Sequence, residues 1–362
     1  MPTTQYRAWA EIDLEALKHN YRFAQTQSGN CEIMAVVKAN AYGHGYKNVI
    51  KHLEALSPAF YGVANVREAR EVRSVLPEAR IYLLGISNPW EYEEIVASEF
   101  TPCISCMEGF RAYAELAQER NITLRVHLAL DTGMGRGGFL PGSSEYAEAL
   151  AFSHPNIEIE GIGSHLPVAD EDADFTRDQI ANFIGAIPAN LKYRHISNSA
   201  GLMKFPASEL NLVRPGLMLY GVSPLPEFQA QLRPVMRLCS RVSIVRNIPS
   251  GQGISYGRTF ITGRDSQIAT VGIGYADGIP RAISGKAVKV WINGQLAPIV
   301  GRVTMDQIMV DVTDLEHVQA GDIVEVFGPN VPLMQISEAA GTIPWEIFTG
   351  IAPRVARNAV TI

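Results

Sequence analysis

The stretch Ile33-Met34-Ala35-Val36-Val37-Lys38 is a short apolar run closed by a cation, which is typical of a buried strand. Amphipathic stretches such as Arg67–Leu76, Met107–Asn121 and Asp174–Ile187 alternate with further runs of this kind. Strands that alternate with helices form a parallel sheet, and eight such units predict a closed (β/α)8 barrel. The other seven apolar runs are Phe60–Asn65, Arg80–Gly85, Phe100–Ser105, Leu124–Asp131, Ile157–His165, Tyr193–Asn198 and Asn211–Leu219.

The sequence changes in character after Pro234, where helical periodicity is nearly absent. Strand-like stretches are separated there by Gly, Pro, Asn and Asp, which predicts a mostly β second domain. Prolines at positions 224, 226 and 234 indicate a linker. We therefore expect an α/β protein with a barrel over residues 12–226 and a β-rich domain over 227–362. The strand-like stretches are Arg237–Val245, Gln267–Ile273, Ala287–Trp291 and Ile323–Phe327.

A doubly wound Rossmann sheet is the alternative architecture for the first part of the chain. It requires a G-x-G-x-x-G motif after an early strand, and no early strand here carries one.

Composition limits the classes of function. A chain of 362 residues with 47% hydrophobic and 19% charged residues is typical of a soluble two-domain enzyme. The net charge of −6 provides no basic surface for nucleic acid or for an anionic membrane. No run is long enough to span a bilayer, and the first seven residues lack the apolar core of a signal peptide, which predicts a cytoplasmic protein.

Cys103 and Cys106 form a C-x-x-C motif. Neither a second cysteine pair nor nearby histidines complete a zinc site, so we expect no metal. A redox pair is the alternative to two small, partly buried residues.

Polar residues close several of the predicted strands. Lys38, His165, the stretch Ser197-Asn198-Ser199 and the stretch Arg214-Pro215-Gly216 all stand at such positions. The active site of a (β/α)8 barrel lies at the C-terminal ends of its strands, so these residues are expected to converge there.

The residues at these strand ends allow two interpretations each. Partial desolvation at the end of an apolar strand lowers the pKa of Lys38 and leaves free amine for Schiff-base chemistry, although a lysine that extends to solvent is the alternative. The N–H groups around Gly216 can hold a phosphate, helped by the Tyr42 hydroxyl, and ordinary turn chemistry is the alternative. We interpret Gly133–Gly138 as a mobile loop that places Arg136.

The stretch Val36-Val37-Lys38-Ala39-Asn40-Ala41-Tyr42-Gly43-His44-Gly45 resembles the cofactor-lysine signature of alanine racemases. Five further segments match that family in the same order: Asp131–Arg136, His195–Ala200, Arg214–Gly216, Ser255–Arg258 and Gly301–Gln307. The resemblance implies a (β/α)8 barrel, a β domain that includes residues 1–11, and pyridoxal 5′-phosphate as cofactor. It also implies a homodimer in which each active site takes residues from the β domain of the partner.

The same resemblance implies a role for each matching residue. Lys38 holds the cofactor and acts as one base, and Tyr256 reaches in from the other subunit as the opposite base. Arg136 and the backbone of Met305 meet the substrate carboxylate. The residues implied to bind the cofactor are Lys38, Tyr42, His165, Asn198, Ser199, Arg214, Gly216 and Leu217, with Arg214 on the pyridine nitrogen and His165 supporting it. The implied activity interconverts L- and D-alanine, which usually supplies D-alanine for peptidoglycan.

An arginine at the pyridine nitrogen has a chemical consequence. Arginine only donates hydrogen bonds, so the ring nitrogen stays neutral and the ring withdraws electrons weakly. A weak electron sink favours simple return of the proton over transamination.

Two positions depart from the family pattern. Ala129 stands where many members carry a lysine whose carbamate orients the arginine, so we expect a bound chloride or a more loosely held Arg136. Pro353 stands where some members have a tyrosine. Both departures leave open a racemase of broader specificity, for serine or larger substrates.

Three rival functions are considered. A decarboxylase with this barrel requires an acidic residue at the pyridine nitrogen, and Arg214 argues against it. A cofactor-homeostasis protein without turnover resembles the barrel alone, and the β domain with Tyr256 argues against that. The third is a structural barrel without cofactor.

Overall fold

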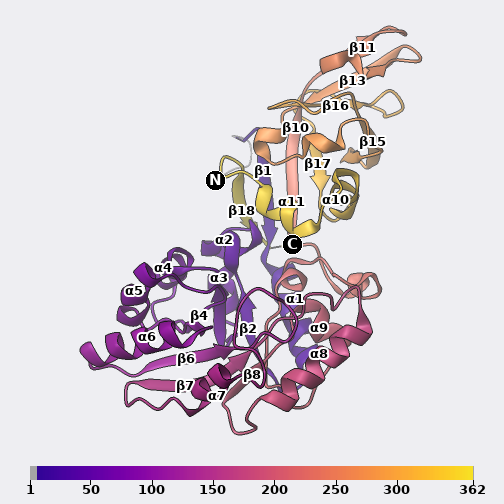
Figure 1. Ribbon diagram of the computed structural model, residues 1–362. Coiled ribbons are helices and arrows are strands. Elements are labelled where there is room, and N and C mark those ends of the chain that lie inside the picture. The colour runs from indigo at the N-terminus through magenta and orange to yellow at the C-terminus, as the bar shows by residue number, and fades with distance from the viewer. Residues whose placement is uncertain (1–5, 362) are drawn as a thin grey trace. The chain divides into compact units, whose positions relative to one another are not determined.

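The structure, a computed structural model, describes residues 6–361, which divide into two compact units (Figure 1). The barrel unit comprises Lys18–Ala41 and Tyr46–Leu232. The β unit comprises the described residues up to Leu17, the short segment Tyr42–Gly45, and the residues from Arg233 onward. Residues 1–5 of the predicted segment 1–11, and residue 362, lie outside the described residues. Among the described residues no helix is long and apolar enough to cross a membrane.

The barrel unit contains a ring of short parallel strands, one in each predicted apolar run. Backbone pairing gives two runs of four, in the orders β4-β3-β2-β9 and β5-β6-β7-β8. A parallel bridge between Tyr82 and Thr101 joins the two runs on one side, and the Asn211 N–H donates to the Arg194 carbonyl at 3.2 Å on the other. The ring therefore closes, which confirms the predicted barrel. The strands are β2 (Glu32–Val36), β3 (Phe60–Val63), β4 (Ile81–Leu83), β5 (Cys103–Ile104), β6 (Leu124–Ala129), β7 (Ile157–Gly163), β8 (Tyr193–His195) and β9 (Leu212–Val213).

Amphipathic helices surround these strands, with α4, α5 and α6 on one side and α8 and α9 on the other (Figure 1). In α4, the residues Val66, Ala69 and Val72 recur at helical spacing and are buried, and the Asn65 side chain caps the helix by accepting the Glu68 N–H at 3.1 Å. The helices are α1 (Leu14–Ser28), α3 (Tyr46–Glu54), α4 (Val66–Val75), α5 (Tyr92–Ala97), α6 (Met107–Glu119), α7 (Ser144–Ala151), α8 (Ala173–Ala186) and α9 (Ser199–Lys204).

The strand that was predicted to end in Lys38 ends at Val36, and the backbone then makes one turn of the opposite hand. Residues Ala39 to Tyr42 of α2 (Lys38–Tyr42) all have positive φ, between 51° and 56°. Four consecutive non-glycine residues in this left-handed region are strained, because Cβ approaches the following carbonyl oxygen. This segment therefore needs support from the surrounding residues.

The β unit is built on one sheet in the order β13-β16-β15-β14-β17-β10-β1-β18. Irregular pairing at Leu238/Cys239 and Val242/Ile244 bends β10, so that its second half also pairs with β13 and closes part of the sheet. The predicted mostly β character is confirmed. The strands are β1 (Ala8–Asp13), β10 (Met236–Ile248), β13 (Ser266–Val271), β14 (Lys289–Ile292), β15 (Gln295–Val300), β16 (Ile308–Asp311), β17 (Ile323–Phe327) and β18 (Ala356–Val360), beside a small hairpin of β11 (Gly253–Ile254) and β12 (Phe260–Ile261).

Two helices in the β unit were not predicted. They are α10 (Met334–Ala340) and α11 (Pro344–Gly350), each seven residues long. Two turns are too short for an apolar repeat of 3.6 residues to stand out, so the sequence shows little periodicity there.

Candidate active site

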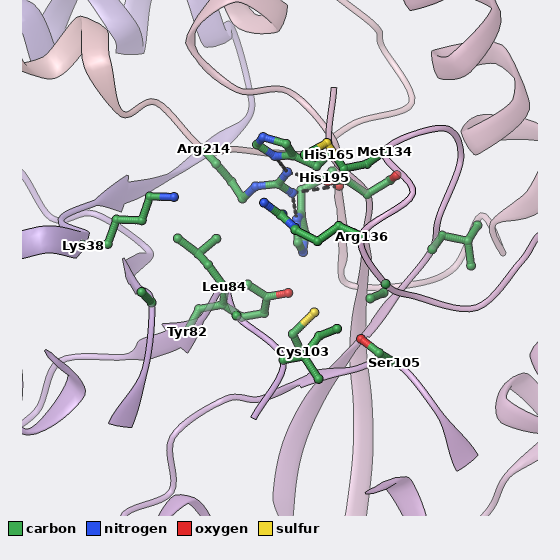
Figure 2. Close-up of a pocket in the computed structure, with 18 residues that line it drawn as sticks. Lys38, Tyr82, Leu84, Cys103, Ser105, Met134, Arg136, His165, His195 and Arg214 are labelled. Atoms are coloured by element: carbon green, nitrogen blue, oxygen red, sulfur yellow. Dashed lines mark hydrogen bonds between the residues drawn. The ribbon is translucent and has the colours of Figure 1, made fainter. Parts of the chain in front are cut away.

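A cavity of about 410 Å3 lies in the barrel unit at the C-terminal ends of the strands. This volume is within the range of small-molecule sites. Figure 2 shows the guanidinium of Arg214 between the rings of His165 and His195, with the amine of Lys38 extending toward the same group. The remaining lining residues that bear on the argument are Tyr82, Cys103, Ser105, Ala129, Arg136 and Ser164.

Lys38 presents its amine to this cavity from the start of the left-handed turn. Burial is the main cause that lowers its pKa, and the positive charges of Arg136 and Arg214 lower it further, whereas the Glu68 carboxylate acts in the opposite direction. A larger share of this lysine is therefore an uncharged nucleophile at neutral pH than of an exposed lysine.

Glu68 supports the turn that carries Lys38. Its two carboxylate oxygens accept the backbone N–H groups of Ala39 and Ala64, each at 2.8 Å. Asn40 adds a second contact, since its side-chain oxygen accepts the Tyr46 N–H at 2.9 Å. These bonds hold the strained backbone beside the cavity.

Arg214 follows β9 and is buried. Its two terminal nitrogens donate to the carbonyl oxygens of Ser164, His195 and Ile196 and face ring nitrogens of His165 and His195. Its Nε–H has no acceptor in the described part of the chain, which leaves one donor for a ligand in the cavity. All contacts of this guanidinium are with neutral acceptors, so it keeps a net positive charge at the site.

His165 lies beside Arg214, with 3.3 Å between its Nδ1 and Nη2 of the arginine. Burial, followed by the charges of Arg214, Arg136 and Lys38, lowers the pKa of His165 to about 3. This imidazole is neutral over the physiological range.

A candidate phosphate-binding corner is formed by Ser199 and the loop after Arg214. The Ser199 hydroxyl accepts the N–H groups of Gly216 at 3.0 Å and Met218 at 3.3 Å, so its own hydrogen remains to donate. Leu217 lies between them at the start of a 3-10 turn, and its N–H has no acceptor among the residues described. Converging N–H and O–H donors of this kind suit an anion.

Asn198 uses its side chain within the protein. Its oxygen caps α9 by accepting the Gly201 N–H at 2.9 Å, and its amide nitrogen donates to the Leu166 carbonyl at 3.0 Å. It therefore holds Ser199 in place, and its side-chain groups are already engaged with protein atoms.

The loop that carries Arg136 is ordered by Asp131. One oxygen of this carboxylate accepts three successive N–H groups, from Gly133, Met134 and Gly135, each at 3.0 Å. The loop is thus fixed at its start, and Arg136 is exposed while its side chain lines the cavity. We interpreted this loop as mobile, and the three bonds to Asp131 restrain at least its first turn.

Three predicted site residues belong to the β unit. Tyr42 is buried, and burial raises the pKa of its hydroxyl. Tyr256 and Met305 are exposed, by 70% and 53%. Large, mainly apolar side chains with this degree of exposure, such as Tyr256 and Met305, are available for contact with a second protein surface.

The β unit holds Met305 in place through two neighbouring loops. The Met305 carbonyl accepts the Ala276 N–H at 2.9 Å. Arg354 bridges the carboxylates of Asp277 at 2.7 Å and Asp306 at 2.8 Å. The three segments that carry Ala276, Met305 and Arg354 are thereby joined.

Four residues in or near the site were not predicted from the sequence: Tyr82, which lines the cavity, and Glu68, His127 and Glu160, which contact residues that line it or lie behind it. His127 and Glu160 lie inside β6 and β7 and are almost fully buried. A histidine and a carboxylate within apolar strands were the signal available, because such groups are rarely buried without a partner. Glu68 gave no such signal on its exposed helix.

The four cysteines, all within the described residues, are free thiols. Cys103 is half-buried and lines the cavity, whereas Cys106 is exposed and not partly buried as predicted. No cluster of potential metal ligands occurs within residues 6–361.

The side chains of the cavity fit pyridoxal 5′-phosphate. Among the residues that line the cavity, the free Nε–H of Arg214 matches the pyridine nitrogen and the amine of Lys38 matches the aldehyde. The donors that match the phosphate are not among the lining residues and belong to the corner formed by Ser199 and the loop after Arg214.

Family profiles match both parts of the chain. Residues 12–224 match the alanine racemase N-terminal domain, and residues 235–359 match the alanine racemase C-terminal domain. The chain is 39% identical to an alanine racemase of Carboxydothermus hydrogenoformans over 363 aligned residues, which cover 96% of this chain and 98% of that protein.

Solved structures share the fold over nearly the full length. The biosynthetic alanine racemase from Pseudomonas aeruginosa superposes with a TM-score of 0.90 at 35% identity, covering 98% of this chain and 100% of that one. The alanine racemase from Bartonella henselae, solved with covalently bound pyridoxal phosphate, superposes with a TM-score of 0.88 at 34% identity, covering 99% and 100%.

Proposed function

Since the chain belongs to the alanine racemase family, we propose that it interconverts L- and D-alanine with pyridoxal 5′-phosphate carried on Lys38. The observation that carries this proposal is the pairing of Lys38 with Arg214 at one cavity, where the arginine keeps a single donor free. A decarboxylase requires an acidic group in the position of Arg214. The carbonyl oxygens around Arg214 are hydrogen-bond acceptors, so they would have no donor to share with a carboxylate in that position.

The residues that would hold the cofactor follow from the donors in the barrel unit. Lys38 would provide the covalent anchor through Nζ, and Arg214 would donate to the pyridine nitrogen through Nε. The Ser199 hydroxyl and the Leu217 N–H would bind the phosphate together with Tyr42, and the Gly216 N–H, donated to Ser199, would orient that hydroxyl. Asn198 fixes the helix end on which Ser199 stands. When bound, the cofactor withdraws electrons from the amino acid and makes its Cα proton acidic.

Racemisation requires that a proton leave one face of Cα and return on the other. Lys38 serves one face, because its lowered pKa leaves a free amine that takes up a proton. Tyr256 of the partner subunit serves the opposite face. The exposure of Tyr256 and Met305 on the β unit supports a homodimer with shared active sites.

Arg136 and the Met305 backbone would bind the substrate carboxylate and hold Cα between the two bases. Arg136 lines the cavity from the loop fixed by Asp131, which places a positive charge near Lys38. This charge also favours the uncharged amine of Lys38.

Exchange of the Cα proton in deuterated water tests the reaction. The chain is incubated with L- and D-forms of alanine, serine and larger amino acids, and deuterium at Cα is followed by NMR together with optical rotation. Deuterium entry with loss of chirality supports a racemase, and the panel measures the substrate breadth that Ala129 and Pro353 leave open. Absence of exchange from every amino acid would refute the proposal.

A mixing experiment tests the shared site. Lys38→Ala and Tyr256→Phe each remove one base and are inactive alone. In random mixed dimers one site in each heterodimer regains both bases, so roughly a quarter of wild-type activity returns after unfolding and refolding the mixture. No recovery would place both bases in one chain.

The supply of D-alanine to peptidoglycan and the cytoplasmic location stay predictions from the sequence.

A further inference from the structure

A row of four buried side chains crosses the interior of the barrel below the cavity. Arg214 faces Nδ1 of His195, and Nε2 of His195 lies 2.8 Å from Nδ1 of His127. Nε2 of His127 lies 3.4 Å from Oε1 of Glu160. Arg80 pairs with the same Glu160 oxygen from the other end, and Lys192 lies 3.9 Å from Oε2. Arg214, His195, His127 and Glu160 are called the histidine row below.

The hydrogen-bonding capacity of each member fixes the direction of the whole row. Arg214 only donates, so Nδ1 of His195 must accept and its hydrogen is on Nε2. That hydrogen is donated to Nδ1 of His127, which places the hydrogen of His127 on Nε2. The Glu160 carboxylate is the acidic group nearest to that hydrogen, with Oε1 3.4 Å from Nε2, but the contact does not have hydrogen-bond geometry. One tautomer of each ring satisfies the contacts among Arg214, His195 and His127, and it directs the Nε2–H of His127 toward the negative charge of Glu160.

The charges in the row agree with this direction. Burial and the nearby Arg214 lower the pKa of His195, and burial, the largest effect, lowers that of His127. Both rings are therefore neutral. Burial opposes ionisation of Glu160, but the nearby His127 ring and the positive charges of Arg80 and Lys192 outweigh it and lower its pKa.

We infer that Glu160 is a positioning residue for Arg214, acting through the tautomers of His127 and His195. This inference rests on the proposed function only in that Arg214 is taken to contact the cofactor. Without the carboxylate, the buried Nε2–H of His127 loses the negative charge 3.4 Å away that favours this tautomer, so the ring gains by moving its hydrogen to Nδ1. His195 must then carry its hydrogen on Nδ1, where it points at a guanidinium that also donates. The Nδ1–H of His195 and the N–H of Arg214 would then repel each other and displace the guanidinium from its position.

The surroundings of His127 suggest a second way to break the row. Its ring is packed by Phe60, Tyr82 and Tyr193, with centroids 5.6, 5.0 and 5.6 Å away. His127→Phe therefore suits an aromatic environment and removes only the link between His195 and Glu160.

The test combines ring NMR with kinetics on the cofactor-loaded protein. Histidine rings are labelled with nitrogen-15, and the protonated nitrogen of each ring is identified from correlations between ring carbon-bound hydrogens and both nitrogens. In the wild type we expect Nε2–H on both His127 and His195. In Glu160→Leu and in His127→Phe, His195 is expected to populate Nδ1–H, and kcat is expected to fall tenfold or more with KM changed less than threefold.

Two controls separate positioning from a general loss of stability. Glu160→Gln keeps an oxygen where Oε1 stands, so both tautomers and at least a third of kcat should remain. Tyr193→Phe removes only the hydroxyl that accepts from Arg80 at 3.1 Å and should leave the row unchanged. Glu160→Leu and His127→Phe are judged only if they fold. The inference is overturned if His195 keeps its hydrogen on Nε2 in a folded variant, or if kcat of that variant stays within twofold of the wild type. The NMR result needs no turnover, so it stands or fails separately from the racemase proposal.

Discussion

Removal of the Glu68 carboxylate is expected to release the strained turn that carries Lys38. Ala39, Ala41 and Tyr42 each cost roughly 1–2 kcal/mol in the left-handed region and Asn40 costs less, so the turn stores roughly 3–6 kcal/mol or slightly more. Glu68 opposes this strain with two bonds of 2.8 Å to backbone N–H groups. A hydrogen bond to a charged group contributes about 1.5–3 kcal/mol, and the lower end applies to this half-exposed side chain. Glu68→Ala should therefore lower the free energy of unfolding by about 2–4 kcal/mol.

Covalent loading of the cofactor distinguishes geometry from charge in the same variant. The Glu68 carboxylate raises the pKa of Lys38, so its removal leaves more free amine and by charge alone would speed loading. Loss of the turn geometry displaces the amine and slows it. We expect geometry to dominate and loading to slow at least tenfold.

Urea unfolding followed by circular dichroism measures the first effect, and borohydride fixation after timed mixing with pyridoxal 5′-phosphate measures the second. Glu71→Ala is the matched control, because Glu71 lies on the same helix and its side chain is exposed. An unchanged urea midpoint together with wild-type or faster loading in Glu68→Ala would refute the role of Glu68.

Three further perturbations test other parts of the molecule. Gly43→Ala places a Cβ 2.1 Å from the Phe348 carbonyl oxygen, at a φ of 78°. It should lower the urea midpoint far more than the control Gly341→Ala, where φ is 71° but no atom lies within 4 Å of the added Cβ. Equal midpoints for the two variants would contradict the clash. The pKa of His165 is about 3 when folded and near 6.5 when unfolded, so the unfolded chain binds the extra proton below pH 6.5. The His165 ring should therefore lower the free energy of unfolding by about 1.4 kcal/mol for each pH unit as the pH drops from 6.5 toward 3. His165→Gln should reduce the slope of the free energy of unfolding against pH by that amount. Arg354→Lys removes the double bridge to Asp277 and Asp306 and should raise the KM for alanine several-fold with kcat nearly unchanged, whereas a fall in kcat alone would argue that Arg354 does not act through the Met305 loop.

Local sequence patterns predicted the barrel well because each of its elements is encoded within a few neighbouring residues. Each predicted apolar run contains a strand, and the capped, periodic stretch at Val66–Val75 forms the predicted helix. The observed strands are shorter than the runs, since residues such as Lys38 and Arg214 leave the sheet at its rim to face the cavity.

Contacts between distant segments could not be predicted in this way. His127 and His195 are 68 residues apart in the chain and meet only when the barrel closes. Neither ring carries a local sign of its tautomer, because the direction of the row is set by Arg214 at one end and Glu160 at the other. The left-handed turn is likewise invisible in Ala39-Asn40-Ala41-Tyr42, because of these residues only Asn40 is of a type that commonly adopts positive φ.

The sequence by itself determined the barrel and the order of the family segments, and it predicted Lys38 as the cofactor lysine, because these depend on residue type and local spacing. The tertiary structure decided how Lys38 is presented and how Arg214 is oriented. It does so through the strained turn held by Glu68 and through the row of buried polar contacts that ends at Glu160. Both depend on partners that the closed barrel brings together, where low polarity makes an unmatched donor costly.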